Sequence, residues 1–354
     1  MKNAGEAKEG TVRTMVLALA REPLIRDIVT RGPGRALARR FVAGETLEDG
    51  LAAARALGQT GGRVSLDYLG EAVTDLAEAA AAAEIYGRTL DHLPVDDISI
   101  TLSLKPSQFG VDLSPSKALT LLEGIAARAA GLGIGIRLDM EDSSRTDVTL
   151  ALWRALHRRF ENVGIVLQAA LYRTPRDFEE VLAEGGSVRL CKGAYAEPAS
   201  IAYPQKSDVD AAYGRLLEQL LTYAATRPPV ADGQLPIAAI ATHDERQVHR
   251  ALALIHGLDL VPGQYEFQML YGVRRDLQGS LIASGYPLRV YTPWGPSWYP
   301  YLTRRLAERP SNVAFLVTAL VSEAWSGGKV SPTLSAWKKR PSPLMWLIVL
   351  VVID

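Results

Sequence analysis

Four polar side chains near residue 300 share one face of a predicted helix, at positions i, i+3, i+4 and i+7: Tyr301, Arg304, Arg305 and Glu308. That face of a helix is normally apolar and buried. Two adjacent guanidiniums can clamp a carboxylate or a phosphate, because each offers a planar fork of donors. On spacing alone, a solvated face with a surface arginine–glutamate pair is the more common arrangement.

Two lysines, Lys105 and Lys192, each stand at the end of a predicted strand. A lysine there can form a Schiff base, pair with a carboxylate or bind an anionic group of a cofactor. Asp139 ends the next predicted strand after Lys105, so we expect these two residues to pair across neighbouring strands. The five histidines show no metal-binding spacing and Cys191 fits a small core residue, so no metal site is expected.

The composition is that of an ordinary soluble globular chain: 354 residues, 48% apolar and 22% charged. Lysine plus arginine number 39, as do aspartate plus glutamate, so no positive field favours nucleic acid as a partner. The single cysteine excludes an intrachain disulfide and fits a reducing, cytosolic compartment. The first residues lack the pattern of a secretory signal, and no apolar run reaches the roughly 20 residues that cross a bilayer.

The elements that must position these residues alternate between short apolar segments and longer helical patterns. Strands are predicted over residues 64–69, 98–104, 134–139, 163–168, 188–192, 237–242, 265–270 and 288–291. Helices are predicted over residues 71–90, 115–131, 146–160, 175–183, 209–225, 245–256, 274–283 and 298–308, after N-terminal helices at 12–20, 23–30, 35–42 and 47–57. Eight such repeats predict a closed (β/α)₈ barrel, with an open doubly wound sheet as the alternative.

We therefore expect an N-terminal helical segment over residues 1–60, a catalytic barrel over 61–320 and a divergent tail over 321–354. In a closed barrel the active site forms where strands end and the following loops begin. Polar residues collect at those ends: Lys105, Asp139, Gln168, Lys192, Tyr195, Thr242, His243, Gln268 and Tyr291. The opposite ends of the predicted strands show no comparable set.

Six segments, taken in order, resemble the proline dehydrogenase family: residues 137–141 (RLDME), 188–195 (VRLCKGAY), 241–244 (ATHD), 265–272 (YEFQMLYG), 289–293 (RVYTP) and 301–308 (YLTRRLAE). The resemblance implies an FAD-dependent (β/α)₈ barrel that oxidises L-proline to Δ1-pyrroline-5-carboxylate, the first step of proline catabolism to glutamate. It also implies that electrons pass to a membrane quinone and that a separate pyrroline-5-carboxylate dehydrogenase is a partner.

The resemblance assigns roles residue by residue. Arg304 and Arg305 would bind the substrate carboxylate, as the clamp above suggests, with Lys105 completing the anion site and Glu308 holding the guanidiniums. The remaining substrate-site residues would be Asp139, Tyr195, Leu270, Tyr291 and Tyr301. The FAD-binding residues would be Gln168, Arg189, Lys192, Gly193, Ala194, Thr242, His243 and Gln268, with Gln168 and Arg189 near the isoalloxazine ring.

Two positions depart from the family pattern: Asp244 replaces an asparagine found in many relatives, and Ala196 replaces a bulky residue. Residues 322–354 match nothing in the family. Their apolar run at 344–353 follows a basic cluster, which indicates a peripheral membrane anchor, a segment packed on the barrel, or an end without function. We expect a cytoplasmic protein, with peripheral contact at the inner face of the cytoplasmic membrane if the anchor exists.

Two other functions stay open at this point. One is a pyridoxal-phosphate-dependent barrel, in which Lys105 or Lys192 would form the Schiff base and the arginines would hold a phosphate. The other is a non-catalytic barrel that serves as partner of an enzyme using pyrroline-5-carboxylate. That reading predicts a broken set of polar residues in the pocket, whereas the sequence shows it complete.

Overall fold

The computed structural model describes residues 38–94, 98–231 and 233–307, with residues 304–307 described as helix only. Ala43–Pro296 forms one compact unit. The second unit combines the residues before Ala43 with those from Ser297 onward, and helix α12 (Trp298–Ala307) belongs to it. The helices predicted at 12–20 and 23–30, Glu308 and the tail from 321 to 354 lie outside the described residues, so the three predicted segments stay a prediction.

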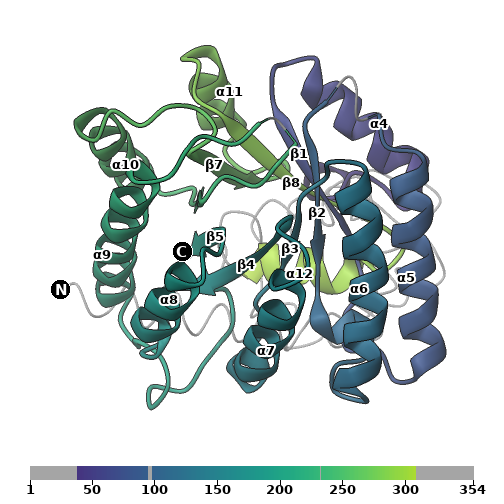
Figure 1. Cartoon of the computed structure of the whole chain (residues 1–354). Helices are drawn as coiled ribbons and strands as arrows, with labels where there is room; N and C mark the ends of the chain where they lie inside the picture. The colour runs from purple at the N-terminus through teal and green to yellow at the C-terminus, as the bar shows by residue number, and fades with distance from the viewer. Residues whose placement is uncertain (1–37, 95–97, 232, 308–354) are drawn as a thin grey trace, which may run out of the picture. The chain divides into compact units, whose positions relative to one another are not determined.

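Eight parallel strands close into a barrel in chain order (Figure 1). They are β1 (Arg63–Tyr68), β2 (Ile100–Leu104), β3 (Ile136–Leu138), β4 (Val163–Gln168), β5 (Val188–Cys191), β6 (Ala238–Ala241), β7 (Tyr265–Leu270) and β8 (Leu288–Trp294). Pairing of β8 with β1, from Arg63 opposite Arg289 to Tyr68 opposite Trp294, closes the barrel. The predicted (β/α)₈ barrel is confirmed, and the open doubly wound sheet is wrong.

Helices surround the strands (Figure 1); α4 precedes β1, and the other helices follow the strands in the chain. Their bounds are α4 (Leu47–Gly58), α5 (Leu76–Asp91), α6 (Pro115–Gly131), α7 (Thr146–His157), α8 (Thr174–Ala183), α9 (Lys206–Ala225), α10 (Glu245–Gly257) and α11 (Arg275–Ala283). Two short 3₁₀ turns, η1 (Pro106–Phe109) and η2 (Ser143–Arg145), follow β2 and β3. Most predicted helices match these bounds within a few residues.

Helix α5 is the main exception, because the predicted start at residue 71 is five residues too early. Asp75 caps the helix by accepting a hydrogen bond from the backbone of Glu78 at 2.8 Å. Ala72 adopts a left-handed φ of 51° and donates its N–H to Ser107 Oγ at 2.9 Å. The segment before the cap is therefore a loop fastened to η1 at the carboxyl ends of the strands.

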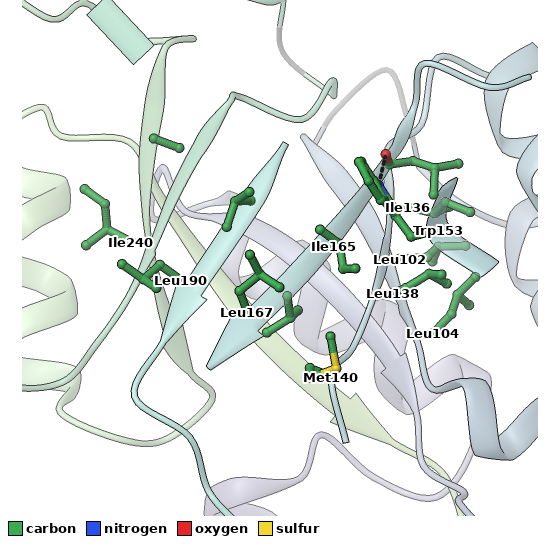
Figure 2. Close-up of a cluster of buried hydrophobic side chains, with 14 of the residues drawn as sticks. Leu102, Leu104, Ile136, Leu138, Met140, Trp153, Ile165, Leu167, Leu190 and Ile240 are labelled. Carbon is green, nitrogen blue, oxygen red and sulfur yellow. Dashed lines mark hydrogen bonds between the residues drawn. The ribbon is translucent and has the colours of Figure 1, made fainter. Parts of the chain in front are cut away.

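The apolar core lies between the barrel and its helices rather than inside the barrel. Outward-facing strand residues form it, including Leu102, Leu104, Ile136, Leu138, Ile165, Leu167, Leu190 and Ile240 (Figure 2). Trp153 on α7 is fully buried in this layer and donates its indole N–H to the carbonyl of Val163 at 3.3 Å. A Cβ at Gly186 would lie 2.4 Å from that indole ring, so only glycine fits there.

Leu138 tests this packing, because it is fully buried on the three-residue strand β3. We expect Leu138→Ala to lower the free energy of unfolding by about 2–5 kcal/mol, through lost burial and the cavity it leaves. Urea denaturation measures the change. The control is Leu132→Ala at the exposed C-cap of α6, which should change stability by less than about 0.5 kcal/mol. Equal effects of the two variants would contradict the packing described here.

Candidate active site

The inside of the barrel is filled with charged and polar side chains, where barrels of this type usually carry branched apolar ones. They come from alternate strand positions, so they face away from the apolar core. The buried cations are Lys105, Arg137, Arg189 and Arg289, and the buried carboxylates are Asp67, Asp139 and Glu266. Buried charges are costly unless they are paired, and all of these except Arg137 pair with an opposite charge.

Lys105 lies where β2 ends, and its ammonium contacts side chains from β1, from β8 and from the end of β3. Its Nζ is 2.5 Å from Asp67 Oδ1, 3.1 Å from the phenol of Tyr291 and 3.7 Å from Asp139 Oδ2. The predicted pair of Lys105 with Asp139 is thus present, but Asp67, which we did not predict, is the nearer carboxylate. Burial lowers the pKa of Lys105, and the two carboxylates outweigh it and raise the pKa above its usual value. Lys105 is a stable ammonium suited to bind an anion.

Tyr291 and Asp139 connect this ammonium to a second cation, Arg189. The phenol of Tyr291 donates to Asp139 Oδ2 at 2.7 Å, and Arg189 Nη1 donates to Asp139 Oδ1 at 2.8 Å. Burial, and after it the charge of Asp139, raises the pKa of Tyr291 well above its usual value, so the phenol stays protonated. The guanidinium of Arg189 lies 5.3 Å from the centre of the Tyr291 ring. Side chains from β2, β3, β5 and β8 therefore form one bonded group.

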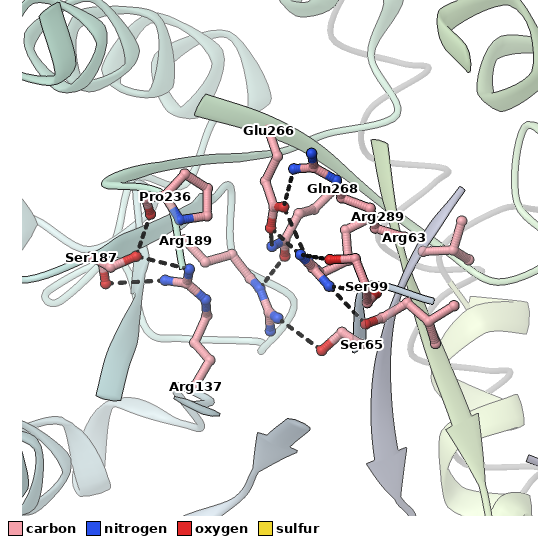
Figure 3. Close-up of polar contacts among 12 residues, drawn as sticks. Arg63, Ser65, Ser99, Arg137, Ser187, Arg189, Pro236, Glu266, Gln268 and Arg289 are labelled. Carbon is pink, nitrogen blue, oxygen red and sulfur yellow. Dashed lines mark hydrogen bonds and ion pairs between the residues drawn. The ribbon is translucent and has the colours of Figure 1, made fainter. Parts of the chain in front are cut away.

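Deeper in the barrel, this group continues into a second layer of charges (Figure 3). Arg189 Nε donates to Gln268 at 2.5 Å, and Gln268 donates to Glu266 at 2.5 Å. Arg289 donates to both oxygens of Glu266, at 2.9 and 3.1 Å. Arg137 instead donates to the carbonyl of Ser187 at 3.0 Å and to its hydroxyl at 3.0 Å.

The sequence indicated no comparable polar set at the opposite ends of the strands, and this expectation is wrong, because Glu266 and Arg289 are buried near the starts of β7 and β8. The residues missed are Asp67, Arg137, Glu266 and Arg289. A signal was present, since Arg137, Glu266 and Arg289 each precede a predicted rim residue by two positions. Residues two apart on a strand face the same side.

Gln168 and Gly193 bring the ends of β4 and β5 close together. The amide of Gln168 donates to the carbonyl of Glu141 at 2.8 Å. Gly193 has a φ of +113°, and a Cβ there would lie 3.3 Å from Gln168 Oε1 and 3.2 Å from Ala170 Cβ. Glycine is thus required at the start of this loop, which continues through Ala194 and Tyr195.

The same loop is fastened to its neighbour after β3. Glu197 accepts hydrogen bonds from the backbone N–H of Ser143 at 2.7 Å and from its hydroxyl at 2.6 Å. These bonds satisfy donors at the start of η2. The loops after β3 and β5 therefore keep a fixed spacing on the rim.

Lys192 occupies a different environment from Lys105. Its ammonium donates to Asp210 on α9 at 2.5 Å and to Asp244, the N-cap of α10, at 2.7 Å. Burial raises the pKa of Asp244, but hydrogen bonds from Lys192 and Arg246 outweigh it and hold the pKa below its usual range. Two carboxylates thus neutralise this ammonium, which joins β5 to two helices.

The end of β6 places Thr242 and His243 beside this group. Thr242 Oγ1 accepts a hydrogen bond from the backbone of Asp244 at 3.1 Å. His243 Nε2 accepts the backbone N–H of Leu270 at 2.9 Å, so its ring proton is assigned to Nδ1. Leu270 ends β7 on the inward face that also carries Gln268.

Helix α12 confirms the predicted helix that carries Tyr301, Arg304 and Arg305. It begins at Trp298 and runs through Tyr301 to Ala307, so residues 301, 304 and 305 have the helical spacing that the sequence indicated. The side chains of Arg304 and Arg305, and all of Glu308, lie outside the described residues. Their contact with a substrate carboxylate, and the place of Tyr301 beside the pocket, stay predictions.

Comparison with known proteins identifies the family. The model of the family described as proline dehydrogenase matches residues 51–318. The chain is 36% identical over 287 residues to proline dehydrogenase 1 of Bacillus subtilis, covering 81% of this chain and 91% of that one. It is 39% identical over 316 residues to proline dehydrogenase of Deinococcus radiodurans, covering 87% and 97%. The chain belongs to the proline dehydrogenase family.

Longer relatives contain a similar segment. The bifunctional protein PutA of Escherichia coli is 32% identical over 338 residues, which are 85% of this chain but 25% of PutA. A crystal structure of PutA from Bdellovibrio bacteriovorus, inactivated by N-propargylglycine, has the same fold with a TM-score of 0.68 at 24% identity. That match covers 77% of this chain and 32% of the longer one.

The prediction of an enzyme, a proline dehydrogenase, is confirmed, and the non-catalytic reading is excluded. The pyridoxal-phosphate reading is excluded as well. The structure agrees for Lys105, because a Schiff-base lysine must react as the free amine, whereas the neighbouring carboxylates raise the pKa of Lys105.

The ion pairs of Lys192 with Asp210 and Asp244 predict a pH-dependent contribution to the stability of this proline dehydrogenase. Asp244→Asn should lower the free energy of unfolding by about 1 kcal/mol at pH 7, since the ion pair is only half-buried. The pKa of Asp244 is lowered in the folded state, so this contribution is present above the unfolded pKa of about 4 and is lost as pH falls toward the folded value.

Urea denaturation of both proteins at pH 7 and at pH 3 measures this effect, and the difference should shrink at pH 3. The matched control is Asp276→Asn, because Asp276 makes a surface ion pair with Arg274 and is 67% exposed. Its effect should stay below about 0.5 kcal/mol. An Asp244→Asn effect that does not depend on pH would contradict the assignment.

Proposed function

We propose that the chain oxidises L-proline to Δ1-pyrroline-5-carboxylate with bound FAD, and that the electrons pass to a membrane quinone. The observation that carries this proposal is the bonded group at the barrel rim, in which Asp139 and Tyr291 hold the cations of Lys105 and Arg189 a fixed distance apart. One cation is suited to the substrate carboxylate and the other to the electron-rich side of a flavin.

The residues on the rim fit a flavin. Gly193 leaves a space next to Gln168 and Ala170 that any Cβ would fill, so the loop after β5 can approach a planar group closely. The donors that would hold the ring are the guanidinium of Arg189 and the amide of Gln168. The ribityl, pyrophosphate and adenosine parts would lie along Lys192, Gly193, Ala194, Thr242, His243 and Gln268. When bound, FAD supplies the acceptor for a hydride from the carbon next to the ring nitrogen of proline.

The chain's own residues orient the substrate. An ammonium has three donors, and Asp67 and Tyr291 engage two of those of Lys105. The third would bind the substrate carboxylate together with Arg304 and Arg305, while Glu308 holds these guanidiniums. Tyr195, Leu270, Tyr291 and Tyr301 would enclose the pyrrolidine ring. A fixed carboxylate fixes the ring, which places the reacting carbon.

Arg189 would contribute electrostatically. Its guanidinium is buried and held by Asp139, Ser103 and Gln268, so it needs no rearrangement when negative charge develops nearby. Preorganised charge of this kind is the largest single contribution in many enzymes.

The partners follow from the same chemistry. The E. coli relative is named a bifunctional protein, and this chain matches a quarter of its length, so we propose that a separate dehydrogenase consumes the product. Among the described residues, no helix has the length and apolarity to cross a bilayer. We propose that the protein works in the cytoplasm and meets the quinone by peripheral contact at the inner face of the membrane.

Anaerobic reduction tests the activity and the cofactor together. The purified protein should absorb near about 450 nm, lose that band when L-proline is added, and regain it with a soluble quinone analogue. Lys105→Met should raise the KM for proline by roughly 30-fold or more, because a buried charge contact is worth about 2–5 kcal/mol. Lys117→Met, at an exposed lysine on α6, is the matched control and should behave as the unmodified chain. Protein that is colourless, or yellow but unchanged by proline, would refute the proposal.

The clamp on α12 can be tested separately. Arg304→Met and Arg305→Met should each raise the KM for proline strongly, by a similar loss of about 2–5 kcal/mol. Arg→Lys at either position should also be poor, because a point charge cannot reproduce the guanidinium fork. Arg215→Met, at an exposed arginine on α9, is the control. A change below about threefold in kcat/KM for both methionine variants argues against a carboxylate site there.

A further inference from the structure

The guanidinium of Arg189 is connected to the lower layer of the barrel through one amide. Arg189 Nε donates to Gln268 Oε1 at 2.5 Å, and Gln268 Nε2 donates to Glu266 Oε1 at 2.5 Å (Figure 3). Gln268 and Glu266 are two residues apart on β7 and face the barrel interior. Gln268 is 3% exposed and Glu266 is 0% exposed, so water does not compete for these contacts.

The order of donors and acceptors is fixed in this series of hydrogen bonds, which runs from Arg189 through Gln268 to Glu266. A guanidinium can only donate hydrogen bonds, and an ionised carboxylate can only accept them. The amide of Gln268 must therefore turn its oxygen toward Arg189 and its nitrogen toward Glu266, because the flipped amide would place two donors and two acceptors in opposition.

Glu266 is well suited to set this orientation. Arg289 Nε donates hydrogen bonds to both carboxylate oxygens of Glu266, at 2.9 and 3.1 Å. Arg63 Nη1 lies 3.7 Å from Glu266 Oε2. Burial raises the pKa of Glu266, but the charge and hydrogen bonds of Arg289 outweigh it and keep the pKa below its usual value. The carboxylate is thus anionic and immobile.

We propose that Glu266 is a positioning residue that fixes the guanidinium of Arg189 through Gln268. The consequence for catalysis rests on the proposed function, in which Arg189 faces the flavin. Asp139 and Ser103 bind Nη1 of Arg189, at 2.8 and 3.0 Å, but neither binds Nε. The contact through Gln268 thus holds Nε, and its loss leaves that edge of the guanidinium with only the long 3.5 Å contact from Nη2 to the hydroxyl of Ser65.

Solvent exchange of the Arg189 Nε proton tests this inference whether or not the purified protein carries a flavin. The Nε–H signal, assigned by its loss in Arg189→Lys, is followed by NMR in the full chain as purified. Gln268→Leu removes the acceptor and should speed exchange at least about tenfold. Glu266→Gln should do the same, because an amide at 266 can donate as well as accept and no longer dictates the orientation of Gln268.

A double-mutant cycle separates positioning from a general loss of stability. If Glu266 acts through Gln268, the combined variant should exchange within about twofold of Gln268→Leu alone. The matched control is Ser187→Ala, which removes the buried hydroxyl bonded to Arg137 and Pro236 and touches neither Gln268 nor Arg189. It should lower the melting temperature and leave Arg189 exchange unchanged. Should Glu266→Gln not fold, Glu266→Gln combined with Arg289→Met removes both charges of the pair and is used in its place.

Two results would overturn the proposal. The first is an Arg189 Nε exchange rate in Glu266→Gln that lies within about twofold of the rate in the unmodified chain. The second is an effect of Glu266→Gln on this rate that is as large in the Gln268→Leu variant as in the unmodified chain. Affinity for FAD provides a second measurement and should fall about tenfold in both single variants. If the unmodified chain binds no flavin, the proposed function fails, whereas the exchange measurement still decides the role of Glu266.

Discussion

Pairing of buried charge inside a closed barrel is the constraint on which the rest of the structure depends. Glu266 and Arg289 are both 0% exposed, and burying either charge without the other would be strongly destabilising. The wider group takes Asp67 from β1, Lys105 from β2, Asp139 from β3 and Arg189 from β5. Tyr291 on β8 reaches Lys105 and Asp139 only when β8 pairs with β1, so closure of the barrel also completes this group.

Stability and chemistry are consequently separated in space. The apolar residues that drive folding face outward, between strands and helices, where Leu138 and Trp153 are fully buried. The inward positions carry charge pairs, which are weak sources of stability because desolvation offsets their attraction. Such pairs do fix the orientation of the inward side chains and the distances between them. The interior thus supplies rigidly oriented cations at the rim, while the outer layer supplies most of the free energy that holds them.

Local patterns predicted much of this arrangement. Apolar runs and helical periodicity located all eight strands and the helices between them, and the strand ends located Lys105, Asp139, Gln168, Gln268 and Tyr291. The partners of these residues were harder to predict, because a carboxylate such as Asp67 is 38 positions from Lys105 in the chain and no local pattern links them. The start of α5 was missed for a related reason, since its loop is fixed by Ser107 on another element.

The two lysines show what a stricter use of strand periodicity adds. Both end a strand, and end position alone gave them the same set of possible roles. Side chains alternate along a strand, so Lys105 shares the inward face of Ser103, whereas Lys192 lies out of phase with the inward Arg189. Lys192 must then point away from the barrel interior, toward the helices, and there it meets Asp210 on α9 and Asp244 at the start of α10. The number of positions that separate a lysine from a known inward-facing residue on its strand therefore decides whether it can reach a substrate inside the barrel. Its position at the end of a strand does not decide this.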